Sequence, residues 1–175
     1  MSGPPGADAA RRLGLAHALM VQGRLAEARA GLVALMRDTP AAAGPAQHLL
    51  ALVERRAGNR AAAAAAFARA LSLLPGDADL HNNHGNFLDA EGKAAAAIAA
   101  YERALRLRPA FAEAAINLGV VALAAGDPEK ALSALERGLK LAPDHARGLS
   151  AYGQALRALG RPDDAAAALN RALAV

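Results

Sequence analysis

The sequence contains no cysteine and no tryptophan, and aromatic residues make up only 3% of its 175 residues. The lack of cysteine excludes disulfide scaffolds and thiolate metal sites. The start, MSGPPGADAA, is polar and rich in turn residues, and no long apolar run follows it. These features argue against a signal peptide and against a membrane span. We therefore expect a cytoplasmic protein with no membrane partner.

Basic charge is not concentrated anywhere in the chain. The formal net charge is +4, and the arginines stand singly or in pairs such as Arg11–Arg12 and Arg55–Arg56, with almost no aromatic residues among them. Nucleic-acid readers usually cluster basic charge and add aromatic stacking platforms. The pattern therefore favours solvated helix faces and predicts no nucleic-acid partner.

The chain is instead rich in small and aliphatic residues. Hydrophobic residues make up 54% of it, so alanine and leucine have to form the core. Alanine is the best helix former. The composition therefore predicts an all-α protein.

Glycine and proline recur with a period of 34 residues, the signature of a repeat architecture. The prolines on this period are Pro75, Pro109 and Pro143. The glycines on it are Gly58, Gly92, Gly126 and Gly160. Gly23 and Pro40 join the series if one residue is inserted within 40–45.

The recurring residues have a physical meaning. Each glycine is expected to end a helix in the left-handed conformation, where a Cβ would be strained. Pro128 and Pro162 follow at the first turn of the next helix, and Asp127 is a candidate N-cap. Each unit is then helix, tight turn, helix. Neither helix can bury its apolar stripe alone, so the units are expected to stack into a solenoid.

The repeated residues resemble the tetratricopeptide repeat (TPR). In 78–111 the matching residues are Gly85, Leu88, Gly92, Ala97, Tyr101, Ala104 and Pro109. The resemblance implies a right-handed α-solenoid of antiparallel helix pairs. The expected repeats are 9–42, 44–77, 78–111, 112–145 and 146–175, in one solenoid preceded by a disordered segment, 1–8.

The stretch DADLHNNHGNFLDAEG, residues 77–92, is unusually polar. The spacing places 79, 82, 83, 86 and 90 on one helix face, and the resemblance implies that this face lines a concave peptide groove. An asparagine amide can both donate to and accept from a peptide. We expect Asn83 and Asn117 to hold the ligand backbone, and their removal to leave stability nearly unchanged. The full predicted groove is Asp79, Asn82, Asn83, Asn86, Asp89, Glu113, Asn117, Val120, Arg147 and Gln154.

His81 and His84 fall at positions where the family packs large apolar side chains. Histidines packed in the core are expected there, and His84, in place of leucine, is a candidate for a pH response. HNNH lacks the ligands of a zinc site. No nucleophile–base arrangement or phosphate-cradling glycine loop appears. We therefore predict a chain without metal or cofactor that is not an enzyme.

The predicted function is a protein-interaction module that binds an extended peptide or partner segment. Two alternatives stay open: the N-terminal recognition region of a longer glycosyltransferase- or sulfotransferase-like enzyme, and a self-assembling scaffold. The last helix, 162–175, carries Leu169, Leu173 and Val175 with few charges. An uncovered apolar patch usually marks an interface. This end is therefore expected to meet a second copy of the chain or a following segment.

Overall fold

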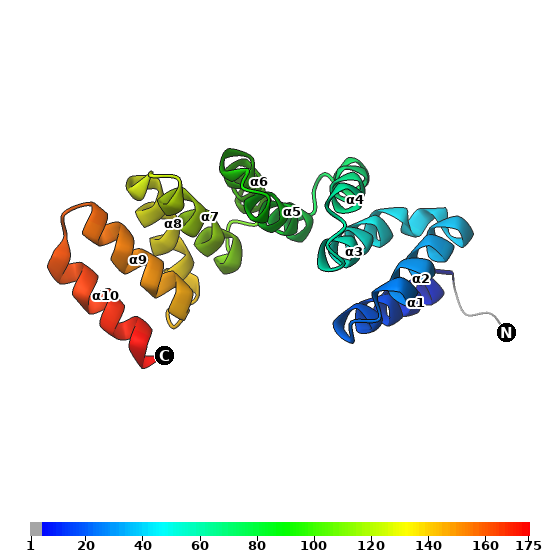
Figure 1. Ribbon diagram of the computed structural model, residues 1–175, viewed down its shortest axis with the longest axis horizontal. Helices are drawn as coiled ribbons and strands as arrows, with labels where there is room; N and C mark the ends of the chain where they lie inside the picture. The colour runs from blue at the N-terminus through cyan, green and yellow to red at the C-terminus, as the bar shows by residue number, and fades with distance from the viewer. Residues whose placement is uncertain (1–4) are drawn as a thin grey trace. The chain divides into compact units, whose positions relative to one another are not determined.

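The computed structural model describes residues 5–175, which form ten α-helices arranged as successive antiparallel pairs (Figure 1). No β-strand occurs in this part of the chain. The helices are α1 Pro5–Val21, α2 Leu25–Asp38, α3 Ala43–Arg56, α4 Arg60–Leu73, α5 Ala78–Ala90, α6 Ala94–Leu107, α7 Ala112–Ala124, α8 Pro128–Leu141, α9 Ala146–Ala158 and α10 Pro162–Ala174. The predicted all-α architecture of helix pairs is confirmed.

The 34-residue period is visible in the helix starts. α5, α7 and α9 begin at Ala78, Ala112 and Ala146. The extra residue inferred near position 40 lies in a short 3-10 helix, Pro40–Ala42, between α2 and α3. The insertion is thus absorbed in the connection between two pairs and leaves the helices themselves intact.

Helix α1 begins earlier than the sequence predicted. It starts at Pro5, so residues 5–8, expected to be disordered, are helical, while 1–4 lie outside the described residues. Proline suits the first helical turn because its missing N–H needs no partner there. Asp8 also pairs with Arg11, and Ala9 is buried. These contacts supply the local stabilisation that the turn-rich composition concealed.

The tight turns within the pairs have the predicted left-handed glycines. At the α7–α8 turn Gly126 has φ +81°, its N–H donates to Leu123 O, and the N–H of Asp127 donates to Ala122 O. This double hydrogen bond is the Schellman motif. The Asp127 side chain then accepts from the N–H of Lys130 at 2.9 Å and caps α8. The remaining left-handed glycines are Gly23, Gly58, Gly92 and Gly160.

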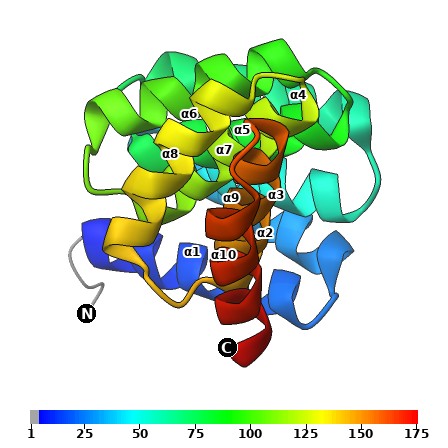
Figure 2. The ribbon, with the colours of Figure 1, turned by 90° about the vertical axis from the view of Figure 1, so that its left-hand side faces the viewer.

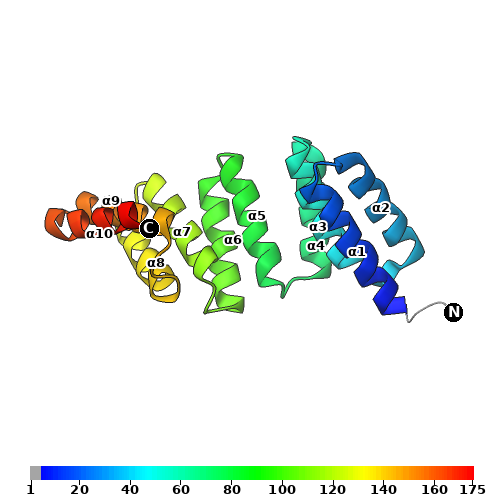
Figure 3. The ribbon, with the colours of Figure 1, turned by 90° about the horizontal axis from the view of Figure 1, so that it is seen from below.

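The chain forms two compact units, one ending at Leu80 and one spanning His81–Val175. In the first, α3 and α4 lie side by side (Figure 3), and Leu32, Leu35, Val53 and Phe67 are fully buried. Glu54 is also buried there, and both its carboxylate oxygens accept from Arg29, at 2.5 and 2.7 Å. This bidentate pair joins α2 to α3 and satisfies a charge that would be costly to bury alone.

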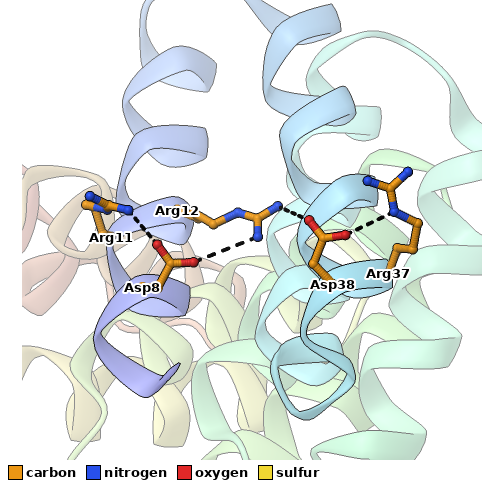
Figure 4. A network of polar contacts seen from close by, with 5 residues as sticks. All are labelled: Asp8, Arg11, Arg12, Arg37 and Asp38. Atoms are coloured by element: carbon orange, nitrogen blue, oxygen red, sulfur yellow. Dashed lines mark hydrogen bonds and ion pairs between the residues drawn. The ribbon is translucent and has the colours of Figure 1, made fainter. Parts of the chain in front are cut away.

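A surface network also joins α1 to α2 (Figure 4). Arg12 donates to Asp38 at 3.1 Å and lies 3.9 Å from Asp8, while Arg37 donates to the other Asp38 oxygen at 3.0 Å. The pKa of Asp38 is lowered, first by the hydrogen bond from Arg37 and then by the one from Arg12. Since these side chains are partly exposed, the network fixes geometry more than it adds stability.

In the second unit α9 lies beside both α8 and α10 (Figure 2). Tyr101, Ile116, Leu135, Leu149 and Leu156 form its buried interior. Close packing within each pair depends on glycines of the first helix, because Gly85 faces the ring of Tyr101 and Gly153 faces Leu169. A Cβ built on Gly153 would lie 2.7 Å from Leu169 Cγ. Helices approach this closely only where a side chain is missing.

The connections between neighbouring pairs repeat as well. The guanidinium of Arg137 on α8 donates to the carbonyl of Pro109 at 2.5 Å, and Arg171 on α10 donates to the carbonyl of Pro143 at 3.1 Å. Both the arginines and the prolines are 34 residues apart. The closing proline of one repeat is therefore held by the second helix of the next.

Candidate functional site

The predicted asparagines form a hydrogen-bonded ladder across the second unit. Asn117 Nδ2 on α7 donates to Asn82 Oδ1 at 3.3 Å and to Asn86 Oδ1 at 3.1 Å, both on α5. Arg147 Nη1 on α9 donates to Asn117 Oδ1 at 3.2 Å. One amide thus joins the first helices of three successive repeats.

Two further groups complete the ladder. Tyr101 on α6 donates its hydroxyl hydrogen to Asn86 Oδ1 at 2.8 Å, and Asn82 Nδ2 donates to Glu113 Oε1 at 3.4 Å. Tyr101 was not among the predicted site residues. A signal was present, because tyrosine at a position where phenylalanine would suffice indicates that its hydroxyl has a polar partner.

Burial divides the predicted groove residues into two groups. Asn82 and Asn117 are 2% and 6% exposed, so their amides serve the contacts between helices. Both N–H groups of Asn117 are directed at Asn82 and Asn86, which leaves little of the amide for a ligand. The expectation that removing Asn117 leaves stability unchanged does not agree with this burial. Asn83 and Asn86 are half-buried, and Asp79, Asp89, Glu113, Arg147 and Gln154 are exposed.

A pocket opens between α7 and α9, beside the ladder. Its volume is about 470 Å³. Val120, Arg147 and Gln154, all predicted groove residues, contribute to its wall, and the other lining residues are Leu123, Ala124, Ser150 and Ala151. Gln154 is oriented by a hydrogen bond to Ser150 Oγ at 3.3 Å. The pocket is therefore mainly apolar, with one cation and two polar groups at its edge.

We call the surface formed by Asn83, Asn86, Glu113, Val120, Arg147 and Gln154 the α5–α7–α9 face. Residues Asn86, Val120, Arg147 and Gln154 are linked on it by the ladder and the pocket. All six residues of this face lie on regular helices and none on a loop, so the helices determine where their side chains begin.

The two histidines of the polar stretch, His81 and His84, are half-buried. The ring of His84 stacks on Phe87 with centroids 6.5 Å apart and planes 20° apart. Burial lowers the pKa of His84, and the neighbouring His81 lowers it further. Within residues 5–175 no group of three or more His, Asp or Glu side chains is arranged to hold a metal ion.

Comparison with known proteins assigns the repeat. Profiles of the tetratricopeptide repeat match residues 48–110, 83–137 and 116–174, and a further one matches 9–30. The chain is a tetratricopeptide-repeat protein. The TPR family generally comprises interaction and scaffold proteins, so the chain is a protein–protein interaction module. No curated protein matches its sequence.

Solved TPR structures share the fold over nearly the whole chain. MamA is 21% identical with a TM-score of 0.80, over 96% of this chain and 91% of MamA. PilF of Pseudomonas aeruginosa is 20% identical with a TM-score of 0.84, over 96% of this chain and 78% of PilF. YrrB, described as a TPR protein with an unusual peptide-binding site, is 22% identical with a TM-score of 0.76, over 93% of this chain and 83% of YrrB. At these identities the likeness concerns the fold alone.

No helix within residues 5–175 has the length and apolar character needed to cross a bilayer.

Proposed function

We propose that the chain binds an extended segment of a partner protein along the α5–α7–α9 face, with one apolar side chain of that segment in the α7–α9 pocket. The pocket is the observation that carries the proposal. It combines apolar walls with a few polar groups at its edge, the usual composition of a ligand site. The ladder supports it by fixing Arg147 at the rim.

The polar groups of the face suit a peptide main chain. Asn83, Asn86 and Gln154 are amides, which both donate and accept, and they stand on helices whose positions are fixed by packing. In this proposal Asn83 and Gln154 contact the ligand, whereas Asn82 and Asn117 position their neighbours. The role first predicted for Asn117 thus becomes an indirect one.

The test is selection from a displayed library of random peptides, followed by affinity measurement on a blocked variant. Ala124 is exposed and lines the pocket, so Ala124→Trp should fill it without disturbing the core. The selected peptides should bind this variant at least about tenfold more weakly, since a side chain of leucine size loses about 1.5–3 kcal/mol of burial. Ala166→Trp is the matched control, because Ala166 is exposed on α10 and does not line the pocket. Equal affinity for both tryptophan variants would contradict the proposal.

We also propose that the outer face of α10 meets a second copy of the chain. Leu105, Leu139 and Leu173 occupy the same repeat position. Leu105 is 6% exposed, and Leu139 reaches α9, where a Cβ on Gly148 would lie 3.2 Å from its Cδ2. Leu173 is 87% exposed. The same repeat position is thus covered on α6 and exposed on α10, and an exposed large apolar side chain suits a hydrophobic interface.

Light scattering on a size-exclusion column tests this second proposal. The wild-type chain should show a concentration-dependent mass above 17.7 kDa, and Leu173→Glu should run as a monomer. A strictly monomeric wild type at high concentration would rule the contact out. Leu169 should not be chosen instead, because it packs against Gly153 and its loss would disturb the fold.

A further inference from the structure

The charges on the first helices of the second unit separate by sign. Between His81 and Ala158, the charged residues of α5 and α7 are the acids Asp89 and Glu113. Those of α9 are the bases Arg147 and Arg157. All four side chains are exposed. Surface charge on this part of the chain therefore changes from negative to positive between α7 and α9.

The acidic and basic residues occupy equivalent repeat positions. The separation of charge therefore occurs at both edges of the α5–α7–α9 face. Glu113 and Arg147 occupy the same repeat position in successive units, since they are 34 residues apart. Asp89 and Arg157 also share a position, two units apart. Corresponding positions stand on corresponding helix faces, so each edge carries an acid on an earlier helix and a base on α9. A ligand lying across these helices meets the two signs in a fixed order.

The apolar pocket lies where the sign changes. Val120, Leu123 and Ala124 of α7 form one wall, and Arg147 on α9 lies at the edge. Arg147 uses one guanidinium N–H on Asn117. A guanidinium has five such donors in a rigid fork suited to a carboxylate. Arg147 is thus held in position while retaining donors for a second partner.

We propose that the ligand is a peptide of mixed charge: an acidic residue next to an aliphatic one, with a basic residue a few positions away. The aliphatic side chain fills the pocket, the carboxylate pairs with Arg147, and the basic side chain lies over Glu113, on the same edge of the face. Neighbouring helices are about 8–10 Å apart, and an extended chain advances about 3.3 Å per residue. The basic residue should therefore lie about three to six positions from the acidic one. This inference rests on the peptide-binding function proposed above and adds its specificity.

The experiment uses the 175-residue chain and four labelled peptides that share the same central leucine. One peptide has a glutamate beside the leucine and a lysine four positions away. A second has lysine at both places, a third has glutamate at both, and the fourth has glutamine at both. Each of the three charged peptides is also made with its sequence reversed. Fluorescence anisotropy then gives the dissociation constants at low salt and at high salt.

The mixed peptide, in one direction, should bind best. An exposed ion pair is worth about 1.4- to 5-fold in affinity, so two pairs should give roughly 2- to 25-fold over the glutamine peptide. The advantage should shrink at high salt because the pairs are exposed. Combined in one chain, Arg157→Glu and Arg147→Glu replace both bases of α9 by acids, and the preference should then move to the peptide with two lysines. Arg157→Glu serves as a second variant because no hydrogen bond of the ladder involves it.

Three other outcomes would each count against the inference. If library peptides bind and are blocked by Ala124→Trp, but the charge sets bind alike, the charge order is wrong and the peptide-binding function stands. The same holds if Arg147→Glu and Arg157→Glu leave the preference unchanged. If no peptide binds in the pocket at all, the proposed function fails and this inference fails with it.

Discussion

Gly85 on α5 faces the ring of Tyr101 on α6 so closely that a Cβ built on the glycine would lie 2.5 Å from Tyr101 Cε1. The hydroxyl group of the same tyrosine donates a hydrogen bond to Oδ1 of Asn86, the next residue along α5. One tyrosine therefore sets the distance between two helices and also anchors the amide ladder.

The first prediction follows from this contact. Gly85→Ala should destabilise the chain by about 1–3 kcal/mol, because Tyr101 is 1% exposed and has no free space into which to move. Gly31→Ala is the matched control, since Gly31 is inside α2 and a Cβ there meets nothing within 4 Å. That variant should gain about 0.5–1 kcal/mol from helix propensity. Chemical denaturation followed by circular dichroism measures both, and equal shifts in the two variants would refute the steric argument.

The second prediction concerns the ladder. Asn117→Ala should cost about 1–3 kcal/mol of stability, because it removes the donor to the buried amide oxygen of Asn82. Asn170→Ala on the exposed side of α10 should change stability by less than about 0.5 kcal/mol. If the two variants have the same melting temperature, the ladder does not contribute to the stability of the fold.

The third prediction is a pH dependence centred on His84. Burial lowers the pKa of His84 in the folded state below its ordinary value of 6.5. The unfolded chain therefore binds the proton more readily, and stability is fully present above about pH 6.5 and falls as the pH drops below it. His48 acts in the same direction, since burial lowers its pKa against the opposing charges of Asp77 and Asp79.

Substitution isolates the contribution of His84. His84→Leu replaces the imidazole by the side chain type that the family places there, and it should reduce the loss of stability between about pH 7.5 and 5.5. Denaturation midpoints at several pH values measure the slope. A slope identical to that of the wild type would assign the pH response to other groups, with His48→Leu as the next variant to examine.

The fourth prediction uses a buried group that lacks a partner. Gln47 on α3 is 9% exposed, and its Oε1 has no hydrogen-bond partner among residues 5–175. An unpaired buried oxygen costs free energy, so Gln47→Met should stabilise the chain by about 1 kcal/mol. Gln47→Glu should instead lower stability, because it places a charge at the same position. Calorimetry on the three proteins decides between these signs.

The architecture could be predicted from the sequence because its determinants are local. A left-handed turn at Gly126 needs glycine, and a helix start at Pro128 tolerates proline, so both features leave a mark in residue type. The start of α1 was missed because MSGPPGADAA suggests turns, while the ion pairs of Asp8 that favour the helix cannot be read from composition.

The site could be predicted only in part. Val120, Arg147 and Gln154, three of the residues predicted for the groove, line one pocket. The burial of Asn82 and Asn117 depends on how closely α5 and α7 approach each other. Residue spacing within a single helix does not predict that distance. Residues separated by 35 positions, such as Asn82 and Asn117, meet only once the repeats are stacked.

The packing contacts of both units join helices that are adjacent in sequence or next but one. Such an array has few contacts between distant parts of the chain, so little loop-closure entropy opposes its folding. Opening a terminal pair breaks one set of neighbour contacts, whereas opening an internal pair breaks two. Amide hydrogens of α10 should therefore exchange with solvent before those of α7, even though both helices have regular hydrogen bonding. A peptide bound on α7 and α9 would slow the amide exchange of these two helices first, and that of the neighbouring helices less.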